Sequence, residues 1–188
     1  MKYLTKLILN SRAYQLTSIP NESNKLDDRF FSHFMPKPMP AQVVVDMINQ
    51  ATGAKESFGT FPERARAVQA SLPPRTPFLN AFGQSHREFL ADIDPKLEPN
   101  LVQTLMMINS PYVEGKVRQG TTAVEVGKQT ANDEQMIRAL YERTLGRSPT
   151  SEEVSRAQSI LAAETNRRES AQDLLWALIT SREFYFNH

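Results

Sequence analysis

Three acidic side chains, Asp92, Asp94 and Glu98, lie within seven residues and form a compact group of oxygen atoms. Hard cations such as calcium take oxygen ligands from flexible loops, so this group could hold a metal ion. A pair of carboxylates can also cleave a glycosidic bond, at separations that a sequence does not give. The segment lacks the glycine and the number of ligands that an EF-hand calcium loop has. The carboxylate of Glu98 would also be favourable at a helix N-terminus. We therefore expect an acidic loop before a helix, with a metal site as the alternative.

Six polar or amphipathic side chains form a second set near the N-terminus. They are Asn10, Arg12, Tyr14, Asp28, Arg29 and His33. A proline-rich loop needs partners for its backbone, so we favour a buried polar network that pins this loop to the first helix. In the alternative interpretation the same side chains form a binding surface for a ligand or a neighbouring domain. His33, beside Phe31 and Phe34, is expected to bond to the backbone rather than to act as a general base.

Two glycine-containing segments share part of a catalytic motif. Residues 83–87 (GQSHR) begin like a nucleophile elbow, but Arg87 stands where the final glycine lets the strained turn form. Residues 120–128 share glycines with a phosphate-binding loop, but Gln129 replaces the Ser or Thr that holds magnesium, and the glycines are too far apart. We expect a polar turn at the first segment and no phosphate site at the second.

The absence of cysteine excludes several kinds of site at once. Disulfides, thiolate zinc sites, iron–sulfur clusters, thiol nucleophiles and covalent haem attachment all need cysteine. The other histidines, His86 and His188, lie far from His33 in the sequence, so no zinc spacing is visible. We assign no catalytic residue, expect no cofactor, and favour a protein without catalytic activity.

Composition places the chain among ordinary globular proteins. It has 188 residues, 40% hydrophobic and 23% charged, with a formal net charge of +1. This length and composition predict one domain, and the scattered basic residues give no reason to expect nucleic acid. No stretch approaches the roughly 20 apolar residues that span a bilayer, so membrane insertion is not expected. In the first residues, MKYLTKLILNSR, the apolar patch is too short for a signal peptide, so we do not expect one there.

The first half is expected to hold two helices around an irregular loop. Apolar spacing predicts an amphipathic helix over 3–14, and proline and polar residues predict a loop over 17–40. We expect the aromatic side chains of that loop to pack on the core. Residues 41–50 predict a helix that ends before Gly53. Its inward side chains would be Val43, Val44, Met47 and Ile48.

The middle is expected to be irregular up to position 97, where glycine and proline are frequent. Within it, alternation over 66–72 predicts a short extended segment. Residues 98–118 (EPNLVQTLMMINSPYVEGKVR) carry the most concentrated apolar segment, and we predict the buried centre of the fold there. The predicted inward face comprises Leu101, Val102, Leu105, Met106 and Ile108. Ser110 and Pro111 predict a cap and a second, shorter helix.

The last third predicts three helices with short links. Asn132 with Gln135 predicts a capped start and Gly146 an end, and Thr150 with Glu153 predicts a capping box. A third helix is predicted to start at Ser170 with Asp173. Trp176 falls beside its apolar stripe, where it would cover a core edge or face a neighbouring domain. The chain closes on the aromatic run 184–186.

These elements predict a fold that is mainly α, a compact multi-helix domain with at most short β segments. Within one domain, 1–188, we expect a helix, loop and helix over 1–52, an irregular middle over 53–97, central helices over 98–131 and a C-terminal three-helix layer over 132–188.

Several segments in order also resemble one family. They are LTKLILNSRAYQL, DRFFSH, AQVVVDMINQATG, EPNLVQTLMMINSP, YERTLGRSPTSEE and DLLWALITSREFYFNH. The sequence resembles a C-terminal domain of unknown function, number fifteen fifty-three, of large exported proteins of planctomycetes and related bacteria. The resemblance implies a mostly helical fold, other domains of the same polypeptide as partners, often one like cytochrome c, and a location outside the cytoplasm. No activity is established for the family.

Two departures from that family carry expectations. Relatives usually have more sequence before the first segment, so the resemblance implies an N-terminally truncated domain. Many relatives also have a CxC pair where this chain has Ala91 and Ile93, so no disulfide, metal or redox role of that pair carries over.

Two functions remain open after these observations. The favoured one is a non-catalytic helical module that packs against other domains of an exported protein. The alternative is part of an extracytoplasmic hydrolase acting on carbohydrate, with Asp92, Asp94 or Glu98 as acid and base. A small-molecule or carbohydrate ligand is compatible with either.

Overall fold

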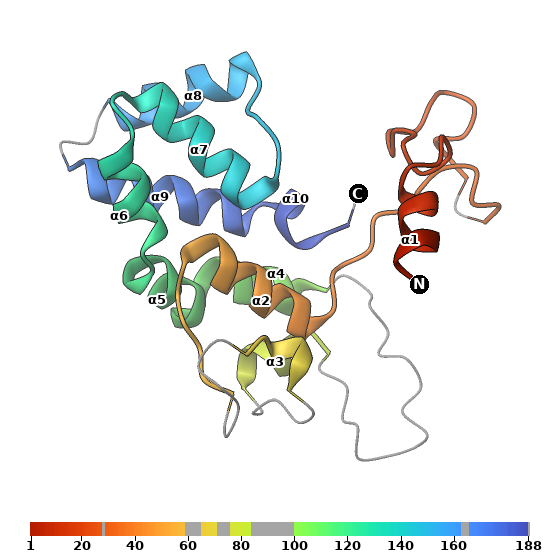
Figure 1. Ribbon diagram of the computed structural model, residues 1–188, viewed down its shortest axis with the longest axis horizontal. Helices are drawn as coiled ribbons and strands as arrows, with labels where there is room; N and C mark the ends of the chain where they lie inside the picture. The colour runs from red at the N-terminus through yellow and green to blue at the C-terminus, as the bar shows by residue number, and fades with distance from the viewer. Residues whose placement is uncertain (28, 59–64, 71–75, 84–99, 163–165, 188) are drawn as a thin grey trace. The chain divides into compact units, whose positions relative to one another are not determined.

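A computed structural model describes residues 1–27, 29–58, 65–70, 76–83, 100–162 and 166–187. The chain forms two compact units, Met1–Lys37 and Pro38–Asn187, which we call unit 1 and unit 2. Helices dominate unit 2, whereas unit 1 has a single short helix in its described residues (Figure 1). The prediction of a mainly α fold is confirmed: the only β-type pairing in the described ranges is an isolated bridge between Pro38 and Phe186.

Unit 1 consists of one short helix followed by turns. The helix α1 (Lys2–Leu9) ends five residues before the predicted position, and none of its residues is buried. Its side chains Leu4, Leu7 and Ile8 are more than half exposed. Phe30 is 82% exposed and Phe31 is 76% exposed, so the rest of unit 1 does not bury these loop aromatics.

The turn after α1 is organised by one carboxylate. Asp27 accepts hydrogen bonds from the Ser32 hydroxyl and from the backbone N–H groups of Phe30 (2.7 Å), Ser32 (2.9 Å) and Arg29 (3.0 Å). These bonds, led by the Ser32 hydroxyl, hold the pKa of Asp27 below its ordinary value. A single side chain therefore satisfies several backbone donors of the loop that was predicted to need a polar network.

Unit 2 contains the other helices of the described ranges. In chain order they are α2 (Ala41–Thr52), the 3₁₀ turn η1 (Ala67–Gln69), α3 (Pro77–Ala81), α4 (Leu101–Asn109), α5 (Pro111–Gln119), α6 (Thr122–Gln129), α7 (Asp133–Leu145), α8 (Ser151–Leu161), α9 (Arg167–Thr180) and α10 (Arg182–Tyr185). The predicted C-terminal layer corresponds to α7, α8 and α9, in which α7 packs on both of the others.

The caps of the C-terminal helices follow the sequence closely. Asn132 accepts a hydrogen bond from the Gln135 N–H at the start of α7 (2.9 Å), and Gly146 ends that helix with φ 71°. Thr150 and Glu153 form the predicted reciprocal capping box at the start of α8. Such caps satisfy backbone groups that the helix leaves without partners, and they depend only on neighbours in the sequence.

Helix α9 is the centre of the core. It packs on α5, α6, α7 and α10, and it runs through the middle of unit 2 (Figure 1). Ala171, Leu175 and Ile179 on this helix have no measurable exposure. The predicted start of the helix at Ser170 is wrong, because Asn166 caps it and Ser170 is buried one turn further on.

A close backbone approach joins α2 to the α5–α6 link. Helix α2 buries Val44, Val45 and Ile48, so Val45 takes the inward position that was predicted for Val43. Gly120 packs on the last residue of this helix: a Cβ atom added there would overlap the carbonyl oxygen of Thr52 and lie 2.8 Å from that of Lys116. Only glycine leaves room for this contact.

Two predictions about the middle of the chain are wrong. In the described part of the predicted extended segment, residues 67–69 instead form η1. The Asp46 carboxylate accepts hydrogen bonds from the N–H groups of Ala67 (2.6 Å) and Val68 (3.2 Å) and so stabilises a tight turn. The described part of the irregular middle also contains the short helix α3, capped by Thr76.

The orientation of α4 is also opposite to the prediction. Leu101 is 72% exposed and Val102 is 57% exposed, and the other side chains of the predicted inward face, Leu105, Met106 and Ile108, are exposed or half-buried. The buried residues of the helix are Gln103 and Met107. The predicted break is confirmed: Ser110 caps α5, and Pro111 is its first residue.

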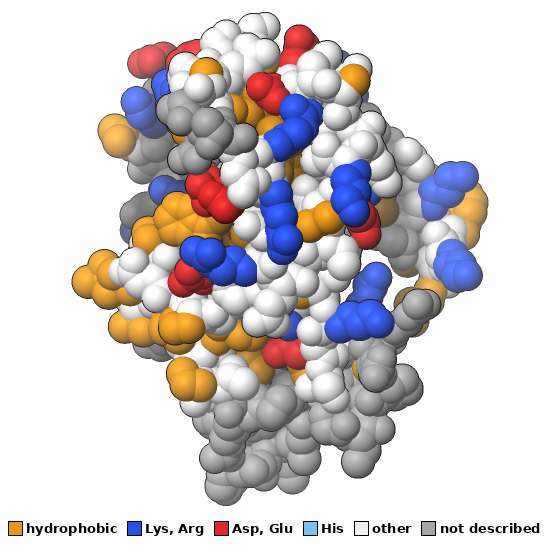
Figure 2. Space-filling view, turned by 90° about the vertical axis from the view of Figure 1, so that its left-hand side faces the viewer, with side chains coloured by type: hydrophobic (Ala, Val, Ile, Leu, Met, Phe, Trp, Pro, Cys, Tyr) orange, Lys and Arg blue, Asp and Glu red, His pale blue; other side chains and the backbone are white. Residues whose placement is uncertain are grey.

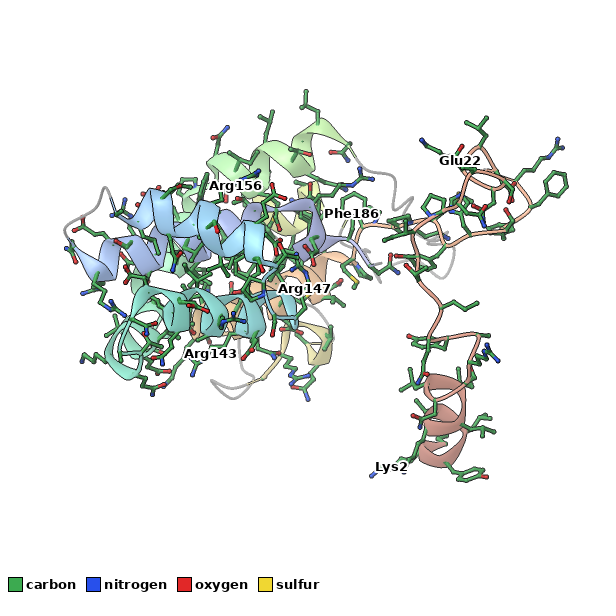
Figure 3. The ribbon with its side chains drawn as sticks, turned by 90° about the horizontal axis from the view of Figure 1, so that it is seen from above. Lys2, Glu22, Arg143, Arg147, Arg156 and Phe186 are labelled. Atoms are coloured by element: carbon green, nitrogen blue, oxygen red, sulfur yellow. The ribbon has the colours of Figure 1, made fainter. Side chains whose placement is uncertain are left out.

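Arg147 ties the α7–α8 turn to the C-terminus. Its guanidinium donates hydrogen bonds of 2.6 to 2.9 Å to both oxygens of Glu153 and both oxygens of Glu183, and it lies 5.6 Å from the Tyr141 ring centre (Figure 3). The hydrogen bonds from Arg147, and then those from Thr150, lower the pKa of Glu153 from 4.5 to about 2, against the opposing effect of burial.

This shift predicts an acid-dependent contribution to stability. A lowered folded-state pKa stabilises the protein above pH 4.5, and the contribution is lost as the pH falls toward 2. Glutamine also suits the third position of a capping box, so Glu153→Gln removes the charge but not the cap. We expect Glu153→Gln to lower the free energy of unfolding by about 1 kcal/mol at pH 7, a modest value because solvent screens a partly exposed pair.

Chemical denaturation at a series of pH values measures this effect. The difference between wild type and Glu153→Gln should shrink to nothing as the pH approaches 2. Glu152→Gln is the matched control, because Glu152 is 82% exposed on the same helix. A difference that does not change with pH would contradict the assignment.

Candidate functional site

The exposed face of α4 borders an apolar groove. The groove lies between α3 and the corner where α4 meets α5, and it encloses about 600 Å³. Its apolar lining includes Pro77, Phe78, Val102, Leu105, Met106 and Tyr112. We call it the α4 groove. Several α4 side chains point away from the rest of unit 2 (Figure 3), and hydrophobic side chains gather along the left edge of the surface in Figure 2.

The floor of the α4 groove is a rigid aromatic group. The Phe78 ring lies 4.7 Å from the Tyr112 ring and 4.9 Å from the Phe82 ring, measured between centroids. Phe78 and Phe82 are almost fully buried. Aromatic pairs at these distances stabilise each other beyond their burial, so the groove has a firm base.

A second cavity lies between α5 and α9. It encloses about 530 Å³ and is lined by side chains of α9, by α5 and by the α4–α5 corner. We call it the α5–α9 cleft. Unlike the α4 groove it is mainly polar, and its lining includes Glu114, Arg118, Glu169, Asp173 and Trp176.

A half-buried polar cluster adjoins the α4 groove at Tyr112. Glu56 accepts hydrogen bonds from the Tyr112 hydroxyl (2.6 Å) and from Asn49 Nδ2 (2.9 Å), and it forms an ion pair with Lys116 (3.2 Å). Burial, and then the hydrogen bond to Glu56, raise the pKa of Tyr112. Tyr112 therefore donates its hydroxyl proton in the hydrogen bond to Glu56, and the cluster fixes the chain after α2 against α5.

The predicted N-terminal set is placed in unit 1, where its described members make local bonds. Asn10 Nδ2 donates to the Lys6 carbonyl (2.9 Å), and the Arg29 N–H donates to Asp27. Asn10, Arg12, Tyr14 and Arg29 are exposed, so these side chains do not form the buried network that was favoured. His33 is half-buried with Nδ1 3.0 Å from the Phe34 carbonyl oxygen, which confirms a histidine bonded to the backbone.

The other predicted site residues lie outside the described residues. These are Asp28, His86, Asp92, Asp94 and Glu98, together with Ser85 of the partial nucleophile elbow. Within the described ranges, no group of three histidine or acidic side chains is close enough to hold a metal ion. No helix in the same ranges combines the length and the apolar character needed to cross a bilayer.

Sequence reasoning missed both cavities. The apolar residues of the α4 groove were recognised, but they were expected to be buried. Glu56 and Tyr112 are far apart in the sequence, and no spacing pattern links them. In the α5–α9 cleft, the position of Trp176 beside the apolar stripe of its helix was the one visible signal.

Comparisons with known proteins give one match. A family model described as PSD1, protein of unknown function (DUF1553), matches residues 1–161. Neither the curated proteins nor the solved structures that were compared contain a significant match.

Proposed function

Because this chain belongs to the PSD1 family of proteins of unknown function (DUF1553), we propose its function from its own surface. It is a non-catalytic packing module, and its α4 groove binds an apolar helix from another domain of a larger exported polypeptide. The family resemblance supplies the expectation of neighbouring domains and of a location outside the cytoplasm.

The observation that carries this proposal is the exposure of α4. Leu101, Val102, Leu105 and Ile108 are each more than 40% exposed, and they lie on consecutive turns of one helix. The α4 sequence, LVQTLMMIN, contains no charged residue. Contiguous apolar surface of this kind usually marks an interaction site, because leaving it in water is unfavourable.

The shape of the groove indicates the partner. An amphipathic helix binds an apolar groove through side chains spaced three and four residues apart. The α4 groove has apolar walls and an aromatic floor, so it suits aliphatic side chains and offers few groups to a charged or sugar ligand. Unit 1 has exposed apolar side chains of its own, Tyr3, Leu4 and Leu7 on α1.

The test introduces a charge into the groove. Leu105 is 47% exposed and lines the groove, so Leu105→Glu should fold normally but weaken binding of the neighbouring domains at least tenfold. Titration calorimetry against those domains, produced separately, measures the affinity. Chemical denaturation of the chain alone measures its stability.

Ile160→Glu is the matched control. Ile160 is 63% exposed on α8, outside the groove, so this change adds the same charge without touching the proposed surface. It should leave binding unchanged. The proposal fails if Leu105→Glu binds like wild type, or if it lowers the free energy of unfolding by about 2 kcal/mol or more, as a core substitution would.

A further inference from the structure

The α5–α9 cleft is a second cavity with different chemistry from the α4 groove. One wall is a face of α9, where Glu169, Gln172, Asp173 and Trp176 recur at spacings of three and four residues and so share one side of the helix. The opposite side of α9 carries the core residues. The facing wall comes from α5 and from the corner at Ser110.

The polar groups of this wall are mostly hydrogen-bond acceptors. Gln172 is 91% buried, and its side chain bonds through Nε2 to the Arg118 carbonyl (3.3 Å). Its Oε1 makes no hydrogen bond to any described residue and is not fully enclosed by protein, so this acceptor is accessible from the cleft. Asp173 likewise has no ion-pair partner in the described ranges, and its carboxylate offers two more acceptor oxygens.

The charges of the lining favour a cation. Glu114 pairs with Arg118 (2.9 Å), which leaves Glu169 and Asp173 without a compensating positive side chain among the described residues of the lining. Among the described residues, Glu169 accepts a single hydrogen bond, from the neutral amide Nδ2 of Asn166 (2.7 Å). These carboxylates do not gather closely enough for a metal ion. A larger cation, which spreads its donors over several acceptors, fits this spacing better.

Trp176 completes the lining. Its indole is half-buried in the cleft wall, three residues after Asp173 and four after Gln172. Indole is the aromatic group that attracts cations most strongly, through the negative face of the ring. An aromatic face beside acceptors and unpaired carboxylates is the combination that recognises organic cations.

We infer that the α5–α9 cleft binds an organic cation that carries N–H donors, a guanidinium or an ammonium group, between Asp173, Gln172 Oε1 and Trp176. The two cavities meet at Asn109 and Ser110, but the three groups proposed to hold the cation all lie on α9, which does not line the α4 groove. Binding here is therefore separate from the packing function, and each can fail without the other.

The chain has a built-in reporter for this binding. Trp176 is the only tryptophan, so intrinsic fluorescence reports on the cleft alone. L-argininamide added to the intact chain should change the fluorescence saturably, and titration calorimetry should give the same affinity. Asp173→Asn should weaken the binding at least tenfold, and raising the salt concentration should weaken binding to wild type.

Glu152→Gln on α8 is the control for charge, because it removes an exposed carboxylate away from the cleft. It should bind L-argininamide like wild type. An acetylated and amidated Gly-Arg-Gly peptide separates two sources of the cation: binding as tight as L-argininamide assigns the site to basic peptide side chains, and weaker binding assigns it to free small cations.

Several outcomes would overturn the inference. One is the absence of heat and of a fluorescence change with L-argininamide. Another is an unchanged affinity in Asp173→Asn with an unchanged denaturation midpoint. A third is binding of neutral methyl glucoside in preference to L-argininamide, which would mean that the cleft recognises hydroxyl groups rather than charge.

Discussion

Gly120→Ala should lower the free energy of unfolding by about 3 kcal/mol, the upper part of the usual cost of overpacking. The added methyl group would overlap the Thr52 carbonyl oxygen and crowd the backbone of Lys116, and backbone atoms cannot move aside as a flexible side chain can. The φ of Gly120 is −68°, which any residue adopts, so the cost is steric and not conformational. Chemical denaturation monitored by circular dichroism measures it.

Gly127→Ala is the matched control and should have the opposite sign. Gly127 lies within α6, and a Cβ atom added there meets nothing within 4 Å. Alanine in a helix interior is more favourable than glycine by about 0.5–1 kcal/mol, so this variant should gain stability. Equal effects of the two substitutions would show that the close approach between α2 and the α5–α6 link does not exist in solution.

Met107→Ala should lower the free energy of unfolding by about 3 kcal/mol. Met107 is fully buried, and its truncation leaves a cavity that neighbouring helices cannot close. Leu101→Ala on the same helix should change the free energy by less than about 0.5 kcal/mol, because Leu101 is 72% exposed. The two variants, compared by chemical denaturation, decide which face of α4 is inward. A larger loss for Leu101→Ala would restore the orientation that its periodicity predicted.

The orientation of α4 could not be obtained from its sequence because the helix is apolar on more than one side. Leu101, Val102 and Leu105 satisfy a helical period, but Met107 lies on another face and is equally apolar. Which of these faces packs depends on helices far along the chain. Gln103 also could not be predicted to face inward, since it is polar. Its side chain is buried while it forms a capping box with Asn100.

Local features of the sequence were predictable for the opposite reason. The caps at Asn132, Ser110 and Thr150 depend on a donor and an acceptor three residues apart, and each is present. The predicted cap at Ser170 and Asp173 was wrong because both residues lie inside α9. There the packing of the helix buries Ser170 and places Asp173 in the lining of the α5–α9 cleft.

The candidate sites were predictable in composition but not in arrangement. Sequence identified the apolar side chains around Leu105 and the marginal position of Trp176, whereas the cavities beside them arise from contacts between separate helices. The Glu56–Tyr112 hydrogen bond likewise joins segments that only the fold brings together. The exposure of a side chain depends on contacts from the whole unit, whereas periodicity depends only on neighbouring positions in the sequence.

The family match and the folded unit end at different points of the chain, and the central helix α9 lies between those two points. The match ends at residue 161, whereas the helix that fills the middle of unit 2 begins at Arg167. A polypeptide shortened to the matched range would keep α7 and α8 but would uncover the sides of α5, α6 and α7 that pack on Leu175 and its neighbours. The matched range therefore excludes the helix on which the core of unit 2 packs.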